Sequence, residues 1–232
     1  MKNINLNKVI KNTIICLLAA LVIVLITSIL WSKHVENYSM TIDEDGLEIL
    51  NAYEFPYYLV EEDNCMRPYD VGDGVITFGP GITYPTEQAG IDDINSRFNT
   101  SYTLEEDCID VDTLHTLQRD IISKYEDIVN HVAIWHFKHF SQDQFNGLVL
   151  LSYNSPNLFQ NEGFKKGILN DELTQEEYIS LADSYYQQLT NYYDNVYTDE
   201  PDDGFGRGWY NRIVDSSEVY FGIDYIYQNN AV

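Results

Sequence analysis

The chain has 232 residues, with 13 Lys and Arg against 37 Asp and Glu, so its formal net charge at pH 7 is -24. Hydrophobic residues make up 44% of it and aromatic residues 14%, which is enough apolar surface for a folded core and excludes intrinsic disorder for most of the chain. Nucleic acid is excluded as a partner, because proteins that bind a phosphate backbone use Lys and Arg to displace its counterions.

An apolar segment near the N-terminus predicts a membrane-spanning helix. Residues 12–32 form a run of 21 residues without Asp, Glu, Lys or Arg. A helix of that length, rising about 1.5 Å per residue, crosses the hydrocarbon core of a bilayer. A cleavable signal peptide is the alternative, but its apolar stretch is shorter and ends at small residues, whereas this one ends at Leu30-Trp31-Ser32. We therefore expect an uncleaved signal anchor.

The charges around this segment predict its orientation. Three lysines precede it (Lys2, Lys8 and Lys11), and only Lys33 follows it closely. The positive-inside rule then makes residues 1–11 a cytoplasmic stub of a single-pass cell-membrane protein and places the rest of the chain outside the cytoplasm. Without the three lysines, the exported part has 10 basic and 37 acidic residues, a net charge of -27. Such a surface disfavours electrostatic adhesion to anionic lipids or wall polymers.

Beyond the membrane segment, residues 33–45 are expected to form a polar stalk and residues 46–232 a folded domain. A short helix should end near Glu54, because Pro56 cannot continue it. Glycines on both sides of the β-forming residues 75–78 predict a small hairpin sheet. Helices are expected over residues 110–133, after the capping-box sequences Ser141-x-x-Gln144 and Thr174-x-x-Glu177, and over residues 208–220. The fold class is therefore α+β, with a small N-terminal β-hairpin subdomain and a larger helical lobe behind one transmembrane helix.

The three cysteines fit this topology. Cys16 lies in the membrane segment, whereas Cys65 and Cys108 form an even pair in an oxidising compartment, where disulfides persist. The sequence leaves open whether the pair is bridged or forms two buried thiols. No metal site is expected, because the spacings among His131, His136 and His139 do not place all three on one helical face.

Four segments in order carry a family resemblance. They are residues 46–54 (GLEILNAYE), Tyr69-Asp70 followed by residues 74–83 (GVITFGPGIT), residues 144–154 (QFNGLVLLSYN) and residues 206–218 (GRGWYNRIVDSSE). Together these segments resemble the phage-type lysozymes, glycoside hydrolase family 24. The first is similar to the family helix that ends in its catalytic Glu, and the second to its Gly-x-x-Thr-Ile-Gly-x-Gly-His-Thr hairpin. The resemblance implies a lysozyme-like fold over residues 46–232.

The resemblance implies a general acid, for which there are two candidates. Glu54 ends the matching helix but lies 15 residues before Tyr69, whereas the family spacing is about seven and would select Glu62. We favour Glu54, because a helix precedes it and a proline follows, while Glu62 lies in an acidic stretch. A carboxyl group partly buried at the end of a helix has a raised pKa and can still donate a proton near neutral pH.

The resemblance also implies a group that positions the attacking water. Asp70 follows Tyr69 directly, where the family has one residue in between, so Asp73 remains an alternative. Thr77 lies in the best-matched strand and is expected to hold the water together with the aspartate. The position of the family histidine is occupied by Ile82.

Three further residues are candidates for substrate binding. Gly79 and Gly81 follow Thr77 at the family spacing, although each glycine could equally serve the geometry of the turn. Asn154 ends the third matching segment and either lines the cleft or caps its helix.

The expected function is that of a peptidoglycan hydrolase, a muramidase that cleaves the β-1,4 bond between N-acetylmuramic acid and N-acetylglucosamine without a cofactor. Its partners would be peptidoglycan glycan strands and, through residues 12–32, the membrane. Two alternatives stay open: a non-catalytic wall-binding module on a lysozyme fold, and another glycan-cleaving enzyme such as a lytic transglycosylase or a chitinase. The sequence specifies no oligomeric state.

Overall fold

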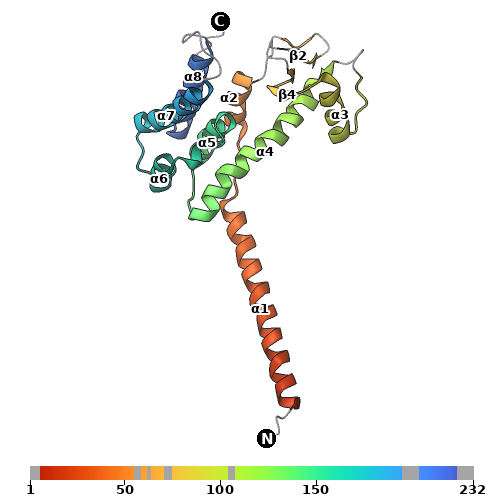
Figure 1. Ribbon diagram of the computed structural model, residues 1–232, viewed down its shortest axis with the longest axis vertical. Coiled ribbons are helices and arrows are strands. Elements are labelled where there is room, and N and C mark those ends of the chain that lie inside the picture. Colours follow the sequence, from red (N-terminus) through yellow and green to blue (C-terminus); the bar gives the residue numbers. More distant parts are fainter. Residues whose placement is uncertain are drawn as a thin grey trace.

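The computed structural model describes residues 6–54, 59–61, 64–70, 75–103, 108–194 and 204–223. A long N-terminal helix projects from a domain that consists of two lobes (Figure 1). The helices are α1 (Leu6–Tyr38), α2 (Glu44–Glu54), α3 (Glu87–Phe98), α4 (Val111–His136), α5 (Gln142–Asn154), the 3-10 helix η2 (Leu158–Gln160), α6 (Glu162–Asn170), α7 (Gln175–Asp194) and α8 (Gly204–Tyr220). The strands are β1 (Cys65–Met66), β2 (Tyr69–Asp70), β3 (Ile76–Phe78), β4 (Ile82–Tyr84) and β5 (Ile109–Asp110).

Helix α1 is longer than the predicted membrane segment. Its stretch Cys16–Tyr38 is long and apolar enough to cross a membrane. Residues 33–38, expected to belong to a polar stalk, are instead the last turns of this helix and pack against α4. Nε2 of His34 donates to the carbonyl oxygen of Ile134 at 2.8 Å, and the ring of Tyr38 stacks on His139 with centroids 4.0 Å apart. Helix α1 is therefore connected directly to the folded domain.

The short link between α1 and α2 is fixed by hydrogen bonds to α4. The side chain of Asn130 accepts a bond from the backbone nitrogen of Met40 at 2.8 Å and donates to its carbonyl oxygen at 2.9 Å. The carboxylate of Glu126 accepts from the backbone nitrogen of Ile42 at 2.8 Å, and Ile42 is itself buried. Because backbone groups that leave water need such partners, this link has one defined path, and that path sets where α2 begins.

The helical lobe contains α2 and α5 to α8, with α5 packed between α4 and α8. Its core includes Phe145, Leu148, Phe164 and Tyr178, all of them fully buried. Both predicted capping boxes are confirmed: Ser141 and Gln144 exchange side-chain and backbone bonds at the start of α5, and Thr174 and Glu177 do so at the start of α7. Helix α8 begins at Gly204, one turn before the predicted start at residue 208.

The β lobe is a small antiparallel sheet of β2, β3 and β4, covered by α3. Phe78 on β3 is buried against α3, where its ring lies close to Gly90. The predicted hairpin is confirmed by the register of β3 on β4, in which Thr77 lies opposite Thr83. A second pair of strands, β1 and β5, joins the two ends of the lobe.

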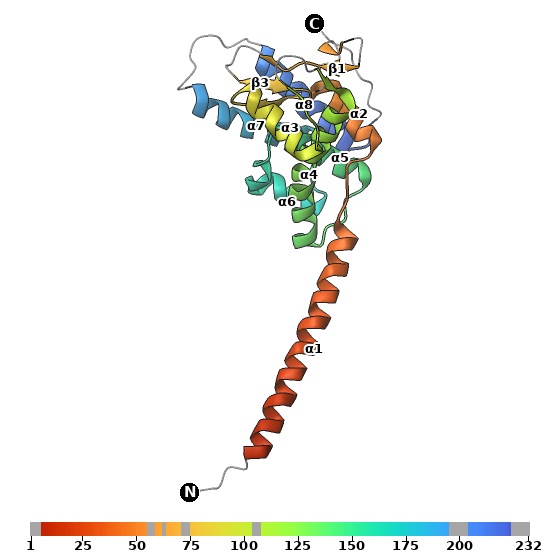
Figure 2. The ribbon, with the colours of Figure 1, turned by 90° about the vertical axis from the view of Figure 1, so that its right-hand side faces the viewer.

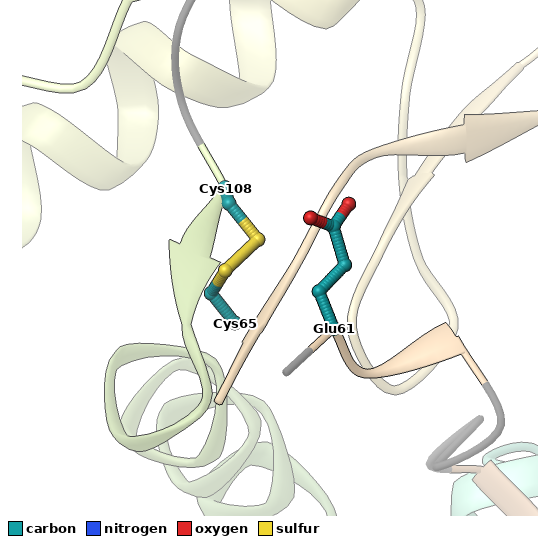
Figure 3. A group of neighbouring side chains, drawn as sticks. All are labelled: Glu61, Cys65 and Cys108. Atoms are coloured by element: carbon teal, nitrogen blue, oxygen red, sulfur yellow. A yellow bond between two sulfur atoms is a disulfide. The ribbon is translucent and has the colours of Figure 1, made fainter. Parts of the chain in front are cut away.

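A disulfide connects these two ends. Cys65 in β1 and Cys108, just before β5, are bonded and have Cα atoms 5.3 Å apart. The two cysteines are 43 positions apart in the sequence, and the segment between them includes β2, β3, β4 and α3. Figure 3 shows Glu61 beside the bridge; its carboxylate accepts a hydrogen bond from Nε of Arg67 at 2.8 Å. The bridge therefore closes the chain segment that forms most of the β lobe.

Helix α4 belongs to both lobes. Leu114 and Leu117 in its first half pack into the core of the β lobe, whereas Ile122, Val129 and Val132 farther along pack into the core of the helical lobe. Figure 2, turned by 90° from Figure 1, shows α4 running from the β strands toward the upper end of α1. The α+β class predicted from the sequence is confirmed, with the lobes joined along this helix.

Candidate active site

Glu54 is the last residue of α2 and lies where the two lobes meet. Leu50, one turn earlier, is buried in the helical lobe and fixes the direction of the helix. The side chain of Glu54 is only 12% exposed. It borders a small cavity whose lining also includes Tyr53, Asn154 and Arg212, so residues from α2, α5 and α8 converge on it.

Arg212 of α8 is the charged partner of Glu54. Its Nη2 lies 3.0 Å from Oε1 of Glu54, in an orientation that makes no hydrogen bond, so charge attraction holds the pair. Nη1 of Arg212 donates to Oδ1 of Asn154 at 2.7 Å. The guanidinium also lies over the ring of Tyr53, 5.5 Å from its centroid. Asn154 and Tyr53 thus hold Arg212 in place while one edge of its guanidinium faces Glu54.

Two opposing effects set the pKa of Glu54. Burial is the larger effect and raises the pKa above its ordinary value of 4.5, because the ionised carboxylate has lost its water. The positive charge of Arg212 acts in the other direction. Among the described residues, no carboxylate adds to these two influences. The net result is an acid that keeps its proton to a higher pH than an exposed glutamate does.

The turn between β3 and β4 approaches Glu54 from the other lobe. Gly79 and Gly81 have positive φ angles of 48° and 75°, which glycine adopts without steric cost. A Cβ atom at Gly81 would lie 3.2 Å from Oε2 of Glu54, so the backbone of the turn passes directly beside the carboxyl group. Gly81 therefore serves the close approach as well as the turn.

Two tyrosines border the same region. The hydroxyl of Tyr153 on α5 donates to the carbonyl oxygen of Pro80 at 3.3 Å and so connects the helical lobe to the β turn. Its ring lies 4.9 Å from the ring of Tyr125 on α4. Burial raises the pKa of both hydroxyls, and the negative charge of Glu54 raises each further. At neutral pH both tyrosines therefore stay protonated and can donate hydrogen bonds beside the acid.

The structure separates the two proposed water-positioning groups. Thr77 lies directly opposite Tyr69 in the sheet, and its side chain is 4% exposed. Asp70, the neighbour of Tyr69, is exposed and pairs with Ile76. Because successive side chains of a strand point to opposite faces, Asp70 and Thr77 lie on opposite faces of the sheet.

Four further positions from the sequence analysis are Asn154, Ile82, Glu62 and Asp73. Asn154 contacts Arg212 and thereby belongs to the acid's surroundings, and its Nδ2 also donates to the carbonyl oxygen of Leu150 in its own helix at 3.3 Å. Ile82, at the position of the family histidine, is buried in the core of the β lobe. Glu62 and Asp73 lie outside the described residues.

Arg212 was not among the candidate site residues predicted from the sequence. The sequence offered one indication of its importance: Arg212 lies in the fourth segment similar to the lysozyme family, two residues after Gly-Trp-Tyr. Nothing local in that segment, however, indicates which carboxylate faces it. That information comes only from the packing of α8 on α5.

One group of candidate metal ligands occurs among the described residues: Glu61 with Cys65 and Cys108. Figure 3 shows that the two sulfur atoms are bonded to each other, so they offer no thiolate ligand. This group is therefore a structural bridge with a neighbouring carboxylate.

Comparison of the chain with protein-family models and with curated proteins found no match. The function must accordingly be inferred from the residues of the site themselves.

Proposed function

We propose that this protein is a membrane-anchored muramidase with a lysozyme-like fold. The observation that carries the proposal is Glu54, a largely buried carboxyl group with a raised pKa at the junction of a small β lobe and a helical lobe. Cleavage of a glycosidic bond needs such a group to protonate the leaving oxygen. The four segments similar to phage-type lysozymes, among them the helix ending at Glu54, support the same function.

Glu54 acts in this proposal as the general acid. Its raised pKa keeps the carboxyl group protonated to a higher pH than that of an exposed glutamate, and proton transfer to the glycosidic oxygen leaves a carboxylate. The guanidinium of Arg212, 3.0 Å away, then stabilises the negative charge that has formed. Asn154 and Tyr53 hold Arg212 in place for this step.

A water molecule attacks the anomeric carbon from the other side of the sugar. We assign its orientation to Thr77 together with Asp73, because Asp70, the other predicted aspartate, lies on the opposite face of the sheet from Thr77. With the water as nucleophile the anomeric configuration is inverted, as in the family that the sequence resembles. No cofactor takes part in these steps.

We further propose that α1 crosses the cell membrane with the N-terminus in the cytoplasm. Its apolar stretch supports the span, and the lysines at its N-terminal end support the orientation. The domain with the candidate site then faces the wall.

A second candidate function is lytic transglycosylation. The placement of Asp70 and Thr77 on opposite faces of the sheet favours it, as does the lack of a second described carboxylate acting on Glu54. In that reaction one carboxyl group suffices: it protonates the leaving oxygen and then accepts the proton of the C6 hydroxyl, which attacks the anomeric carbon in place of water. The product is an anhydro sugar.

The assignment of the acid is tested by the clearing of a peptidoglycan suspension with the full chain in detergent. Glu54→Gln should reduce the rate by at least about 100-fold, because the amide cannot donate the proton. Glu48→Gln, an exposed position on the same helix, is the matched control and should keep the wild-type rate. Full activity of Glu54→Gln together with its loss in Glu62→Gln would move the acid to Glu62.

A further inference from the structure

The end of α4 nearest to α1 carries exposed aromatic side chains. Among the described side chains that follow α1, four large hydrophobic residues are exposed: Trp135, Phe137, Tyr210 and Ile223. Two of these lie at one place, the last turn of α4 and its cap, where Trp135 is 58% and Phe137 67% exposed. Exposed aromatic residues that cluster in this way mark a surface that contacts something other than water.

This cluster adjoins the upper part of α1. The ring of Trp135 lies 5.5 Å from that of Trp31, and the ring of Phe137 lies 4.5 Å from that of His34. Figures 1 and 2 both show the C-terminal end of α4 beside the upper end of α1. These contacts place the C-terminal end of α4 beside Trp31 and His34 of α1.

This part of α1 is also where its uncharged, apolar stretch ends. Trp31 is the penultimate residue of the uncharged stretch 12–32 and is followed by the exposed Lys33. Trp at the end of a membrane helix sits among the lipid headgroups, and a lysine just beyond it extends toward water. A side chain that touches Trp31 from the adjacent helix therefore lies at the same depth.

We infer that Trp31, Trp135 and Phe137 form an aromatic collar that inserts into the headgroup region of the bilayer. The occupant of this surface is the lipid interface itself, because the collar is continuous with a membrane-spanning helix. The strongly acidic domain cannot approach a membrane by charge attraction, and Lys138 beside the collar is already paired with Asp171. Burial of aromatic rings provides a mode of contact that does not depend on charge.

The collar would hold the candidate site close to the membrane. Tyr125, which borders Glu54, precedes Trp135 by ten residues on α4, a distance of about 15 Å along the helix. If the proposed muramidase function holds, the enzyme then cleaves glycan strands next to the membrane rather than in the outer wall. This consequence rests on the proposed function, whereas the collar itself rests only on the membrane span of α1.

The test uses the full chain as one copy per phosphatidylcholine nanodisc, without any glycan. Three variants each retain one tryptophan, with phenylalanine at the other two positions: Trp31, Trp135, or Trp209. Trp209 belongs to α8, and Figures 1 and 2 show this helix in the part of the domain away from α1. The probe is quenching of tryptophan fluorescence by lipids with a nitroxide either near the headgroup or near the end of the acyl chain. Circular dichroism verifies that each variant is folded.

Quenching of Trp135 to about the same extent as Trp31, stronger with the headgroup nitroxide, with Trp209 unquenched, is the result expected of the collar. Quenching of Trp31 without quenching of Trp135 would overturn the inference while leaving the anchor intact. A blue shift of Trp135 seen only with two copies per disc would also overturn it, in favour of contact between copies. Loss of muramidase activity cannot mimic any of these results, since no substrate is present.

Discussion

Glu54 combines two requirements that act against each other. The proposed catalysis needs a carboxyl group with a raised pKa, and burial supplies that, but burial also makes the ionised form unfavourable in the folded state. The folded protein therefore binds this proton more tightly than the unfolded chain, whose glutamate titrates near 4.5. The resulting free-energy cost is absent at low pH and grows as the pH rises above that value.

Glu54→Gln should consequently stabilise the protein while it abolishes activity. At pH 7 we expect a melting temperature about 2–4 °C above that of the wild type, which corresponds to about 1 kcal/mol in the free energy of unfolding for a chain of this size. At pH 4 the two proteins should melt together. Thermal denaturation of both at the two pH values measures the difference; a Gln variant that gains stability only at low pH would contradict the sign.

Arg212 opposes the effect of burial on the pKa of Glu54, so its removal should change the pH profile. In Arg212→Gln the pKa of the acid rises further, and the alkaline limb of the activity profile moves to higher pH. The rate at the optimum falls by about 100-fold, because the carboxylate formed after proton transfer has lost its cation. Initial rates of glycan cleavage from pH 4 to 9 give both quantities.

The matched control for this variant is Arg97→Gln on α3. Arg97 also pairs with a carboxylate, that of Asp93, but on the surface of the β lobe. Its profile should overlay that of the wild type. An alkaline limb that stays in place or moves to lower pH in Arg212→Gln would contradict the predicted effect of Arg212 on the pKa of Glu54.

Individual residues could be located from the sequence where the surrounding segment has a characteristic pattern. The helix ending at Glu54 and the glycines of the turn could be located from their own residues and from the family resemblance. The partner of Glu54 could not, because Arg212 and Asn154 come from helices far away in the sequence. Nor could the sequence reveal that strand alternation separates Asp70 from Thr77, since this depends on the pairing of Tyr69 with Thr77.

At the scale of elements, α4 connects every functional part of the molecule. Its first half supports the β lobe, its middle carries Tyr125 beside Glu54, and its end contacts α1. A single rigid helix can in this way maintain the distance between the membrane and the candidate site.

The disulfide should stabilise the β lobe strongly. It closes a segment of 43 residues, for which the loss of chain entropy in the unfolded state amounts to about 4 kcal/mol. The double variant Cys65→Ala with Cys108→Ala is expected to lower the free energy of unfolding by about 2–4 kcal/mol and to speed amide exchange in β2 to β4 more than in α5. Urea denaturation and hydrogen exchange measure these effects.

Cys16→Ala is the control for the double variant. Cys16 is a free cysteine in α1 and should be neutral for the stability of the domain. Equal acceleration of exchange in α5 and in the strands would show that the bridge acts on the whole domain rather than on the β lobe.

Element prediction was most successful where capping chemistry is local. The starts of α5 and α7 followed from Ser141 and Thr174 with their partners three residues later. The segment 33–38 was assigned to a stalk because its residues are polar, yet it is helical, since α4 supplies contacts to His34 and Tyr38. Helices α3 and α6 were not individually predicted, because both are short and rich in polar residues.

At the scale of the whole molecule, the proposed function gives separate roles to the acidic domain and to the apolar helix α1. A net charge of -24 disfavours adhesion to an anionic wall, so in this account the membrane helix determines where the enzyme works. The aromatic collar adds an orientation to that location. The apolar segment and the negative charge could be predicted from the sequence. The contact between the end of α4 and the end of the apolar stretch of α1 could not, because it depends on how the two helices pack.

The most direct test of the central claim is mass spectrometry of the fragments that the full chain releases from purified peptidoglycan. The wild type should release disaccharide-peptides with N-acetylmuramic acid at a free reducing end, and Glu54→Gln should release none. Anhydro ends instead would identify a lytic transglycosylase acting through the same carboxyl group. Binding of the wild-type protein to the sacculi with no fragment released would contradict catalysis and leave a wall-binding module.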